Sequence, residues 1–210
     1  MSKFDYITEM KDFHEMTKKN MKAFADCLAV SFEGYPLFKY FMPNKDDAEN
    51  MKFFWNIDLK TIHGRMFCVA DSENPNTLGL FAPPGYKDTS TLGYIASGGI
   101  GLGFKYSPGM IIRSLDFQSF AGKIKEKYSG DKCWYLYCLV TRPHLQGKGY
   151  GSRLLRPMLE YFDRTKSECY LETFEDDNIT LYEHYGFTLC EKVQVPKSDL
   201  ILRAMLRKPQ

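Results

Sequence analysis

The residues best suited to bind a phosphate group form a glycine-rich turn at 146–151. The turn reads Gln-Gly-Lys-Gly-Tyr-Gly, and it follows an apolar and aromatic run at 133–140 whose length suits a β-strand. After the turn, apolar side chains recur at helical spacing over 154–162, which predicts an amphipathic helix. The first N–H groups of a helix have no partner inside it, and the helix dipole adds positive potential there. A glycine-rich turn that opens a helix therefore predicts a site for a phosphate or pyrophosphate group.

The pattern of this turn differs from two common nucleotide-binding motifs. No Gly-Lys-Ser/Thr sequence ends it, as in a Walker loop, and it does not spell G-x-G-x-x-G. It reads Gln-x-x-Gly-x-Gly, with Gln146, Gly149 and Gly151 at the fixed positions. A glycine-rich surface turn that binds no ligand is the alternative interpretation.

A second group of polar residues follows the segment 170–174, which predicts another buried strand. Asn178 and Tyr182 are four residues apart, so they share one face of a helix and can contact the same ligand. Gly186 stands where a glycine is expected to end that helix. Tyr182 is a candidate general acid, and a tyrosine that only packs its helix on the sheet is the alternative.

Glu172 lies inside the strand predicted at 170–174. In the strand alternation it shares a face with Tyr170 and Phe174, which places a carboxyl group among apolar neighbours. Loss of solvent raises the pKa of such a carboxyl toward neutrality, which suits a general base. The alternative is a carboxylate that forms a salt bridge with a lysine or arginine at the strand end.

Taken in order, these motifs resemble those of the GNAT (GCN5-related) N-acetyltransferase family. The turn at 146–151 is similar to the family's acetyl-CoA pyrophosphate loop, and the pattern Asn-x-x-x-Tyr-x-x-x-Gly-Phe at 178–187 is similar to the segment that leads into its sixth strand. Residues 131–210 are most similar to the puromycin N-acetyltransferase-like members, whereas residues 1–130 agree with them only in length and general character. Further shared stretches are Cys133-Trp134, Leu171-Glu172-Thr173, Val193-Gln194-Val195-Pro196 and Met205-Leu206-Arg207-Lys208-Pro209.

The resemblance implies an enzyme that moves an acetyl group from acetyl-CoA to a primary amine of a small molecule by direct attack. Tyr182 would protonate the departing thiolate, Glu172 would take the proton of the amine, and Asn178 would bond the pantetheine arm. The other residues implied to bind acetyl-CoA are Cys138, Leu139 and Val140, through backbone groups that pair with the pantetheine, and Gln146, Gly147, Lys148, Gly149, Tyr150 and Gly151, through amides that hold the pyrophosphate. The Lys148 side chain is either a further phosphate contact or a solvated lysine.

Two other functions fit the same motifs. A protein N-terminal or lysine acetyltransferase needs an open groove for its peptide, whereas the long helices expected before residue 130 predict a covered pocket. A non-catalytic CoA-binding regulatory module would be expected to lack the side chains of Glu172 and Tyr182, and both are present. Several aromatic side chains either wall an acceptor pocket or belong to the core: Phe32, Tyr35, Trp55, Tyr94 and Phe104.

The order of elements predicts an α/β (mixed α+β) fold. Helices are expected at about 9–32, from Asp46 or Asp47 to about Met66, and at 88–98, 107–127, 150–164 and 178–185, with a short aromatic segment at 37–42. Strands are expected at 66–70, 77–82, 133–140, 168–174, 187–195 and 199–206. This order predicts a mixed, mostly antiparallel sheet with helices on both faces. The GNAT resemblance implies that the fourth and fifth strands splay apart, within one domain over 1–210 that has an acceptor half (1–130) and an acetyl-CoA half (131–210).

Composition excludes several other classes of protein. The 28 basic and 26 acidic side chains give a net charge of only +2, which does not predict a nucleic-acid surface. No apolar run approaches the roughly 20 residues of a membrane span, and the N-terminus lacks the pattern of a signal peptide. The six cysteines show no metal-ligand spacing, so we expect no metal and a reducing cytoplasmic location. A homodimer is compatible with the sequence.

Overall fold

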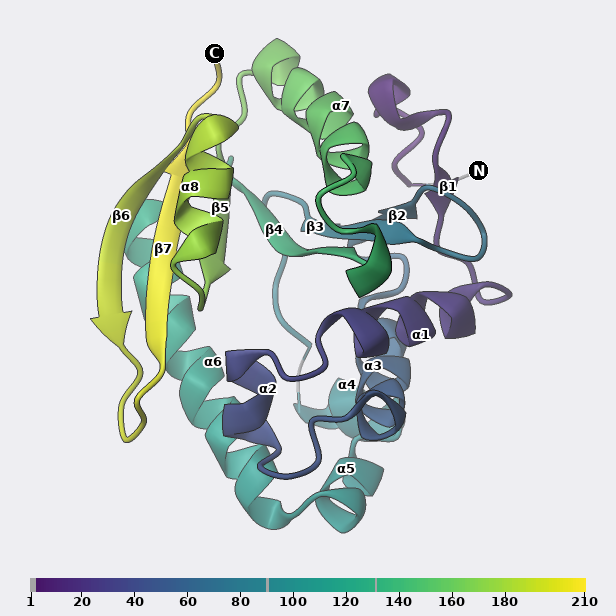
Figure 1. The fold of residues 1–210 in the computed structure, drawn as a ribbon, viewed down its shortest axis with the longest axis vertical. Helices are drawn as coiled ribbons and strands as arrows, with labels where there is room; N and C mark the ends of the chain where they lie inside the picture. Colours follow the sequence, from purple (N-terminus) through teal and green to yellow (C-terminus); the bar gives the residue numbers. More distant parts are fainter. Residues whose placement is uncertain (1–2, 90, 131) are drawn as a thin grey trace.

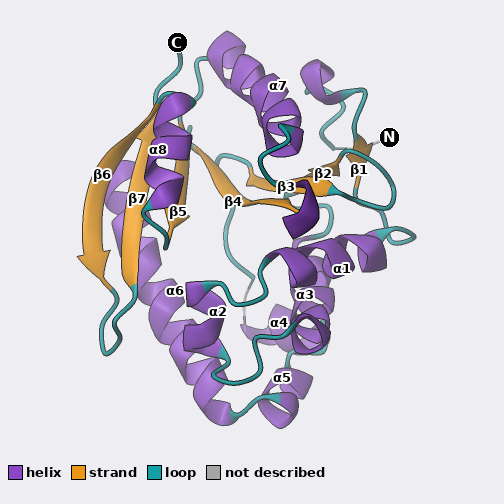
Figure 2. Cartoon of the chain, viewed as in Figure 1, coloured by secondary structure: helices purple, strands orange, loops and turns teal. Residues whose placement is uncertain are grey.

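A sheet with helices on both faces organises the chain (Figures 1 and 2). The computed structural model describes residues 3–89, 91–130 and 132–210, and within them the sheet has seven strands in the order β1-β2-β3-β4-β5-β7-β6. β4 and β5 are parallel, whereas the other neighbouring strands are antiparallel. The mixed, mostly antiparallel sheet predicted from the sequence is therefore confirmed.

The elements have the following bounds. The strands are β1 (His14–Glu15), β2 (Phe67–Ala70), β3 (Thr77–Ala82), β4 (Trp134–Thr141), β5 (Cys169–Thr173), β6 (Phe187–Gln194) and β7 (Ile201–Arg207). The α-helices are α1 (Met21–Ser31), α2 (Pro36–Phe41), α3 (Ala48–Ile62), α4 (Thr91–Ala96), α5 (Ile100–Lys105), α6 (Pro108–Tyr128), α7 (Tyr150–Thr165) and α8 (Asp177–His184). Two 3₁₀ helices are η1 (Thr8–Met10) and η2 (Pro143–Leu145).

One face of the sheet is covered by α7 and α8 (Figure 1). Leu154 and Phe162 of α7 are fully buried, and they belong to one apolar cluster with Phe81 and Trp134 of the sheet. These positions are the apolar face that the helical spacing over 154–162 predicts, so burial of that face holds α7 against the sheet.

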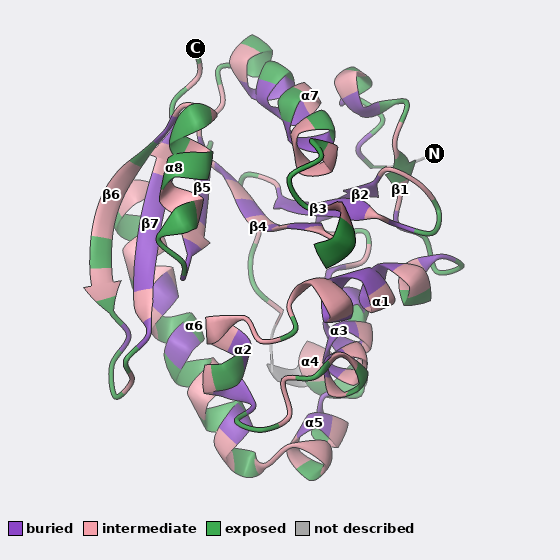
Figure 3. Cartoon of the chain, in the orientation of Figure 1, coloured by how far each residue is buried: buried purple, intermediate pink, exposed green. Residues whose placement is uncertain are grey.

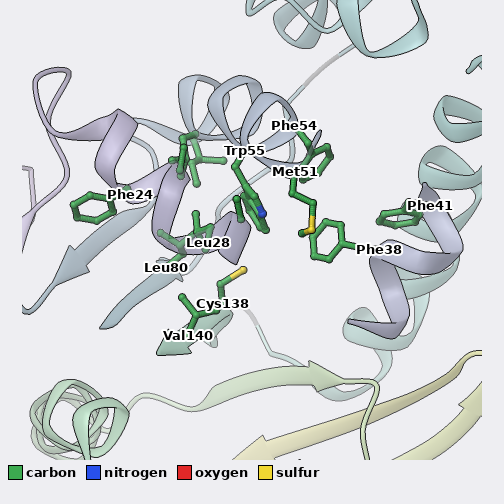
Figure 4. Close-up of a cluster of buried hydrophobic side chains, with 14 of the residues drawn as sticks. Phe24, Leu28, Phe38, Phe41, Met51, Phe54, Trp55, Leu80, Cys138 and Val140 are labelled. Carbon is green, nitrogen blue, oxygen red and sulfur yellow. The ribbon is translucent and has the colours of Figure 1, made fainter. Parts of the chain in front are cut away.

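The other face is covered by α1, α2, α3 and α6. Leu28 of α1 and Trp55 of α3 pack with Leu80 of β3 and Cys138 of β4 in a second apolar cluster (Figure 4). Burial follows this arrangement (Figure 3): β7 is buried along most of its length, whereas much of α6 is exposed.

A β-bulge at Tyr137 interrupts β4. Phe81 of β3 pairs with Leu136, but the next residue of β3, Leu80, pairs with Cys138, so Tyr137 is the extra residue. In a regular strand Leu136 and Cys138 would lie on the same face. Here Leu136 packs on the α7 side and Cys138 on the α1 and α3 side. The bulge therefore turns Cys138 toward α1 and α3, the side that Tyr137 faces by regular alternation.

β4 and β5 separate soon after they meet. They pair only where Trp134–Leu136 lies beside Cys169–Leu171, and β4 then continues to Thr141 without β5 beside it. The predicted splay of the fourth and fifth strands is confirmed, and it leaves one edge of β4 open to a ligand.

The helix predicted at 9–32 is wrong over its first half, because α1 begins only at Met21. The preceding segment is extended instead: β1 pairs with β2, and the amide of Met16 donates to the carbonyl of Cys68 at 2.8 Å. Asn20 then holds the turn before α1, since its Oδ1 accepts a hydrogen bond from the Thr17 amide at 2.7 Å. The apolar spacing behind this predicted helix includes Met16, which is a core residue but lies before α1.

Other boundaries also differ from the prediction. The aromatic segment at 37–42 forms α2, which begins at Pro36, a residue suited to the first turn of a helix. The helix expected at 88–98 is shorter, α4, and Ser90 of that prediction lies outside the described residues. Gly98, at φ +99°, separates α4 from the unexpected α5. In the described part of the chain, no helix has both the length and the apolar character needed to cross a membrane.

Candidate active site

A cavity of about 930 Å3, called the main cavity below, runs from the loop before α7 to the side of α3. Its lining includes the second half of β4, the end of β5, α8, and residues of α1 to α6. All of the site residues predicted from the sequence line it except Lys148. The structure therefore gathers residues far apart in the sequence around one space.

The end of the main cavity near α7 is formed by the glycine-rich turn. Gly147 and Gly149 have φ of +72° and +81°, a backbone region that favours glycine. Gly149 is the N-cap of α7, and no side chain in the described parts of the chain caps this helix end. A Cβ built on either glycine would have no atom within 4 Å, so open space lies beside the turn. Uncapped helix amides beside open space can bind a pyrophosphate.

The turn is held by its own polar side chains. Gln146 donates from Nε2 to the carbonyl of Thr141 at 3.2 Å, which ties the turn to the end of β4. Lys148 donates from Nζ to the carbonyl of His144 at 3.1 Å and is exposed. Its side chain therefore folds back on the chain at η2 and does not reach the main cavity.

The middle of the main cavity is bounded by the open edge of β4. Cys138, Leu139 and Val140 line it beyond the point where β5 leaves β4. Because a strand edge carries unpaired backbone groups, an extended ligand can lie there as an added strand. Cys138 is a free thiol, as are the other five cysteines. Burial raises the pKa of the Cys138 thiol, so it stays protonated beside this edge.

α8 presents two predicted residues to the main cavity. Asn178 donates from Nδ2 to Oγ1 of Thr173 at 2.8 Å, which fixes the start of α8 to the end of β5. The Tyr182 ring packs edge-to-face on Phe187, with centroids 5.6 Å apart. Burial raises the pKa of Tyr182, so its hydroxyl keeps its proton at working pH. Gly186, at φ +83°, ends the helix as the sequence predicts.

Glu172 is half-buried and its carboxyl is bound by tyrosines. The hydroxyl of Tyr170 donates to Oε1 at 3.0 Å, and that of Tyr135 donates to Oε2 at 3.4 Å. Burial raises the pKa of the carboxyl to about 7, although both hydrogen bonds and the charge of Lys125 act to lower it. Among the described residues no salt bridge reaches Glu172, so the salt-bridge interpretation finds no support. A carboxyl that titrates near neutral pH can accept a proton from a bound amine.

Asp58 of α3 is a candidate that the sequence analysis missed. It is only 5% exposed, and its carboxyl lines the far end of the main cavity. Oδ1 accepts from the hydroxyl of Tyr94 at 3.5 Å and Oδ2 from that of Tyr137 at 3.4 Å. Burial raises its pKa to about 7. The available signal was an acidic residue between Ile57 and Leu59 in the apolar part of a predicted helix.

Most of the aromatic residues considered from the sequence belong to the wall of the main cavity. Phe32, Tyr35, Trp55 and Tyr94 line it. Phe104 does not, because its side chain projects from α5 and is 89% exposed. For Phe104 both interpretations, a pocket wall or a core residue, are therefore wrong.

Comparisons with known proteins agree with this geometry. The model of the acetyltransferase (GNAT) family matches residues 38–187. An uncharacterized N-acetyltransferase of Schizosaccharomyces pombe is 30% identical over 92 residues, which are 43% of this chain and 36% of that protein. The match thus spans about a third of the length of this curated relative.

Two solved structures cover nearly the whole chain. A structure described as histone acetyltransferase HPA2 and related acetyltransferase, from Corynebacterium glutamicum, aligns with a TM-score of 0.63 at 20% identity over 94% of this chain and 96% of its own. Arylalkylamine N-acetyltransferase 2 from Aedes aegypti aligns with a TM-score of 0.63 at 15% identity over 94% and 98%. At such identities the likeness shows a shared fold.

Proposed function

This chain belongs to the GNAT acetyltransferase family, and we propose that it transfers an acetyl group from acetyl-CoA to a primary amine of a small molecule. One observation carries the proposal. The main cavity joins a helix-opening glycine turn to Glu172, whose pKa is about 7, and to the hydroxyl-bearing Tyr182. A phosphate site, a proton acceptor and a proton donor along one space are what this reaction requires.

In this proposal acetyl-CoA lies along the part of the main cavity between α7 and β4. The amides of 146–151 hold its pyrophosphate, and the open edge of β4 at 138–140 pairs with its pantetheine arm. Asn178 bonds the same arm from α8. The Lys148 amide contributes to the turn, while its side chain remains bound to His144.

The chemistry needs two proton transfers. The amine nitrogen attacks the thioester carbonyl, the carbon–sulfur bond breaks, and the acetyl group moves to nitrogen. Glu172, directly or through a water molecule, takes the proton that the amine loses, and Tyr182 donates a proton to the leaving sulfur. The sulfur leaves as a thiol, so no covalent bond to the enzyme forms.

A small acceptor is favoured over a protein because of what covers the far end of the main cavity. Side chains from α1 to α6 line that end, and many of them are aromatic. We also propose that the halves 1–130 and 131–210 act as one domain, since β3 of the first half pairs with β4 of the second. The free state of the six cysteines supports the proposal of a reducing, cytoplasmic location.

Release of free CoA tests the proposal. The chain is incubated with acetyl-CoA and a panel of small primary amines, a peptide with a free N-terminus, and a lysine peptide. We expect amine-dependent release with small amines and little with either peptide. Release with the peptides alone would favour protein acetylation, and the absence of release with every acceptor tested would favour the non-catalytic module.

Acetyl-CoA is expected to raise the melting temperature, because a ligand that binds only the folded state stabilises it by mass action. At 100 times the Kd the gain is about 2.7 kcal/mol, or on the order of 5–10 °C for a chain of this size. Gly149→Asp should abolish the shift, since its carboxylate would lie against the pyrophosphate. Differential scanning calorimetry measures both.

Gly64→Asp is the matched control. Gly64 has φ of +69° and no atom within 4 Å of a built Cβ, so this substitution brings the same backbone strain and the same charge. Gly64 does not line the main cavity. We expect the Gly64 variant to keep the acetyl-CoA shift. Loss of the shift in both variants, or in neither, would contradict a pyrophosphate site at 146–151.

A further inference from the structure

Asp58 places a buried carboxyl in the main cavity without a basic partner. Its recorded partners are the hydroxyls of Tyr94 and Tyr137, at the long distances of 3.5 and 3.4 Å, and among the described residues no salt bridge reaches it. An ionised carboxylate in such a place is costly unless a cation joins it. Asp58 lines the cavity together with Tyr94 and Tyr137, whose hydroxyls bind its carboxyl, so a ligand can approach this group.

The fold brings three elements together at this point. Asp58 comes from α3, Tyr94 from α4, and Tyr137 from the bulge of β4. Tyr137 faces α3 by ordinary alternation with Tyr135, and the bulge turns Cys138 to the same side. Bulges next to a ligand site often re-aim a side chain in this way.

A second observation also indicates a polar occupant. Among the residues that the structure describes, the indole Nε1 of Trp55 has no hydrogen-bond partner, although Trp55 is 2% exposed and lines the main cavity. In Figure 4 its side chain extends from α3 toward the strand that carries Cys138. Buried donors are rarely left unpaired, so this N–H is available to a water molecule or to an acceptor atom of a ligand, whereas an ammonium group has no lone pair to accept from it.

The surroundings favour a cation. Phe32 stacks on Trp55 with centroids 5.5 Å apart, and the rings of Tyr94 and Tyr137 border the carboxyl. Aromatic faces attract organic cations. The charged side chains that line the main cavity in the described chain are four acids and one base: Asp58, Asp88, Glu172 and Glu175, and Lys125.

Asp58 and Glu172 form two sites rather than one. Tyr137 binds Asp58 and Tyr135 binds Glu172, and the two tyrosines project from the same face of β4 with ring centroids 5.8 Å apart. The reacting amine must become neutral, so it cannot remain the counter-ion of a second carboxylate. A cation at Asp58 must therefore be a different group of the acceptor.

We propose that Asp58, with Tyr94 and Tyr137, binds a second basic group of the acceptor, so that the acceptor is a diamine whose other amino group reacts beside Glu172. This inference rests on the proposed amine acetylation. Asp58 then selects the substrate and orients it, and takes no part in the proton transfers.

The test compares α,ω-diamines of three to six carbons with the n-alkylamines of the same lengths. The wild type should show a KM for the best diamine about 10- to 100-fold below that of its matched monoamine, as expected for a charge-assisted hydrogen bond. Asp58→Asn should remove this difference by raising the KM of the diamine, with kcat and the monoamine nearly unchanged. Asp12→Asn, an equal change of charge at an exposed position, should behave as wild type.

Calorimetric titration of the same amines, without acetyl-CoA, separates this inference from the proposed function. If the wild type binds the diamine more tightly than the monoamine and Asp58→Asn does not, the site stands even if no acetyl transfer occurs. If Asp58→Asn weakens both amines equally, or neither, the site is overturned, even if acetyl transfer to monoamines proceeds. Melting curves at pH 6 check that Asp58→Asn folds.

Discussion

Replacing Tyr182 by phenylalanine is expected to lower kcat by about 10²- to 10⁴-fold, the usual contribution of a positioned general acid. The ring packs on Phe187, so phenylalanine keeps that contact and removes only the hydroxyl. Because burial raises the pKa of Tyr182, the hydroxyl is protonated and ready to donate at any pH where the protein is assayed. Steady-state kinetics with saturating acetyl-CoA measure the loss. Calorimetric titration should give nearly unchanged acetyl-CoA affinity.

Tyr161→Phe provides the matched control for Tyr182→Phe. Tyr161 belongs to the apolar cluster on which Tyr182 packs, but it does not line the main cavity. The same loss of a hydroxyl there should leave kcat near the wild-type value. Wild-type turnover by Tyr182→Phe with a good acceptor would make Tyr182 a packing residue, and a water molecule would then be the proton source.

The residues of the acetyl-CoA half could be predicted because their motifs are local. Gln146 to Gly151 lie within one turn, and Asn178 and Tyr182 within one helix, so sequence spacing alone determines which of them share a face. The helix after the turn begins at Tyr150, as its apolar spacing predicts. Strand alternation likewise indicates a carboxyl among apolar side chains at Glu172.

The acceptor end could not be predicted in the same way, since its contacts join distant parts of the chain. Tyr137 and Asp58 are 79 residues apart, and no local pattern indicates which helix packs on the face of β4 that carries Tyr137. The helix predicted at 9–32 was wrong over its first half for a related reason. A buried residue such as Met16 is apolar whether its backbone is helical or not, so its type does not identify the element. Phe104 shows the converse, an apolar residue that the fold leaves exposed.

Glu172→Gln is expected to lower the rate by about 10²- to 10⁴-fold near neutral pH, because the amide keeps the shape of the carboxyl but cannot accept a proton. In the wild type kcat/KM should rise with pH as Glu172, with a pKa of about 7, loses its proton. The variant lacks this rise and must wait for the amine itself to deprotonate, near pH 10.4 for a lysine-like amine. The deficit should therefore shrink as pH increases. Asp58 also titrates near pH 7, so the profile of Asp58→Asn is needed to assign the rise to Glu172.

Although Glu172→Gln is expected to lower the rate, we expect it to stabilise the folded chain at alkaline pH. Folding raises the pKa of Glu172 from 4.5 to about 7, so between these values the folded chain holds a proton that the unfolded chain has lost. The free energy of unfolding therefore falls as pH rises through this window, and the loss is complete above about pH 7. Glu172→Gln removes this loss, so its melting temperature should exceed that of the wild type at pH 8 and approach it at pH 5.

Glu168→Gln is the matched control, because it removes an acidic charge next to β5 without removing the Glu172 carboxyl. Glu168 immediately precedes β5, and it does not line the main cavity. We expect this variant to keep the wild-type pH–rate profile and show no stabilisation at pH 8. If Glu172→Gln instead gives a profile parallel to wild type at every pH and a lower melting temperature, the carboxylate is a structural residue. The proton of the amine must then leave through water bound along the open edge of β4.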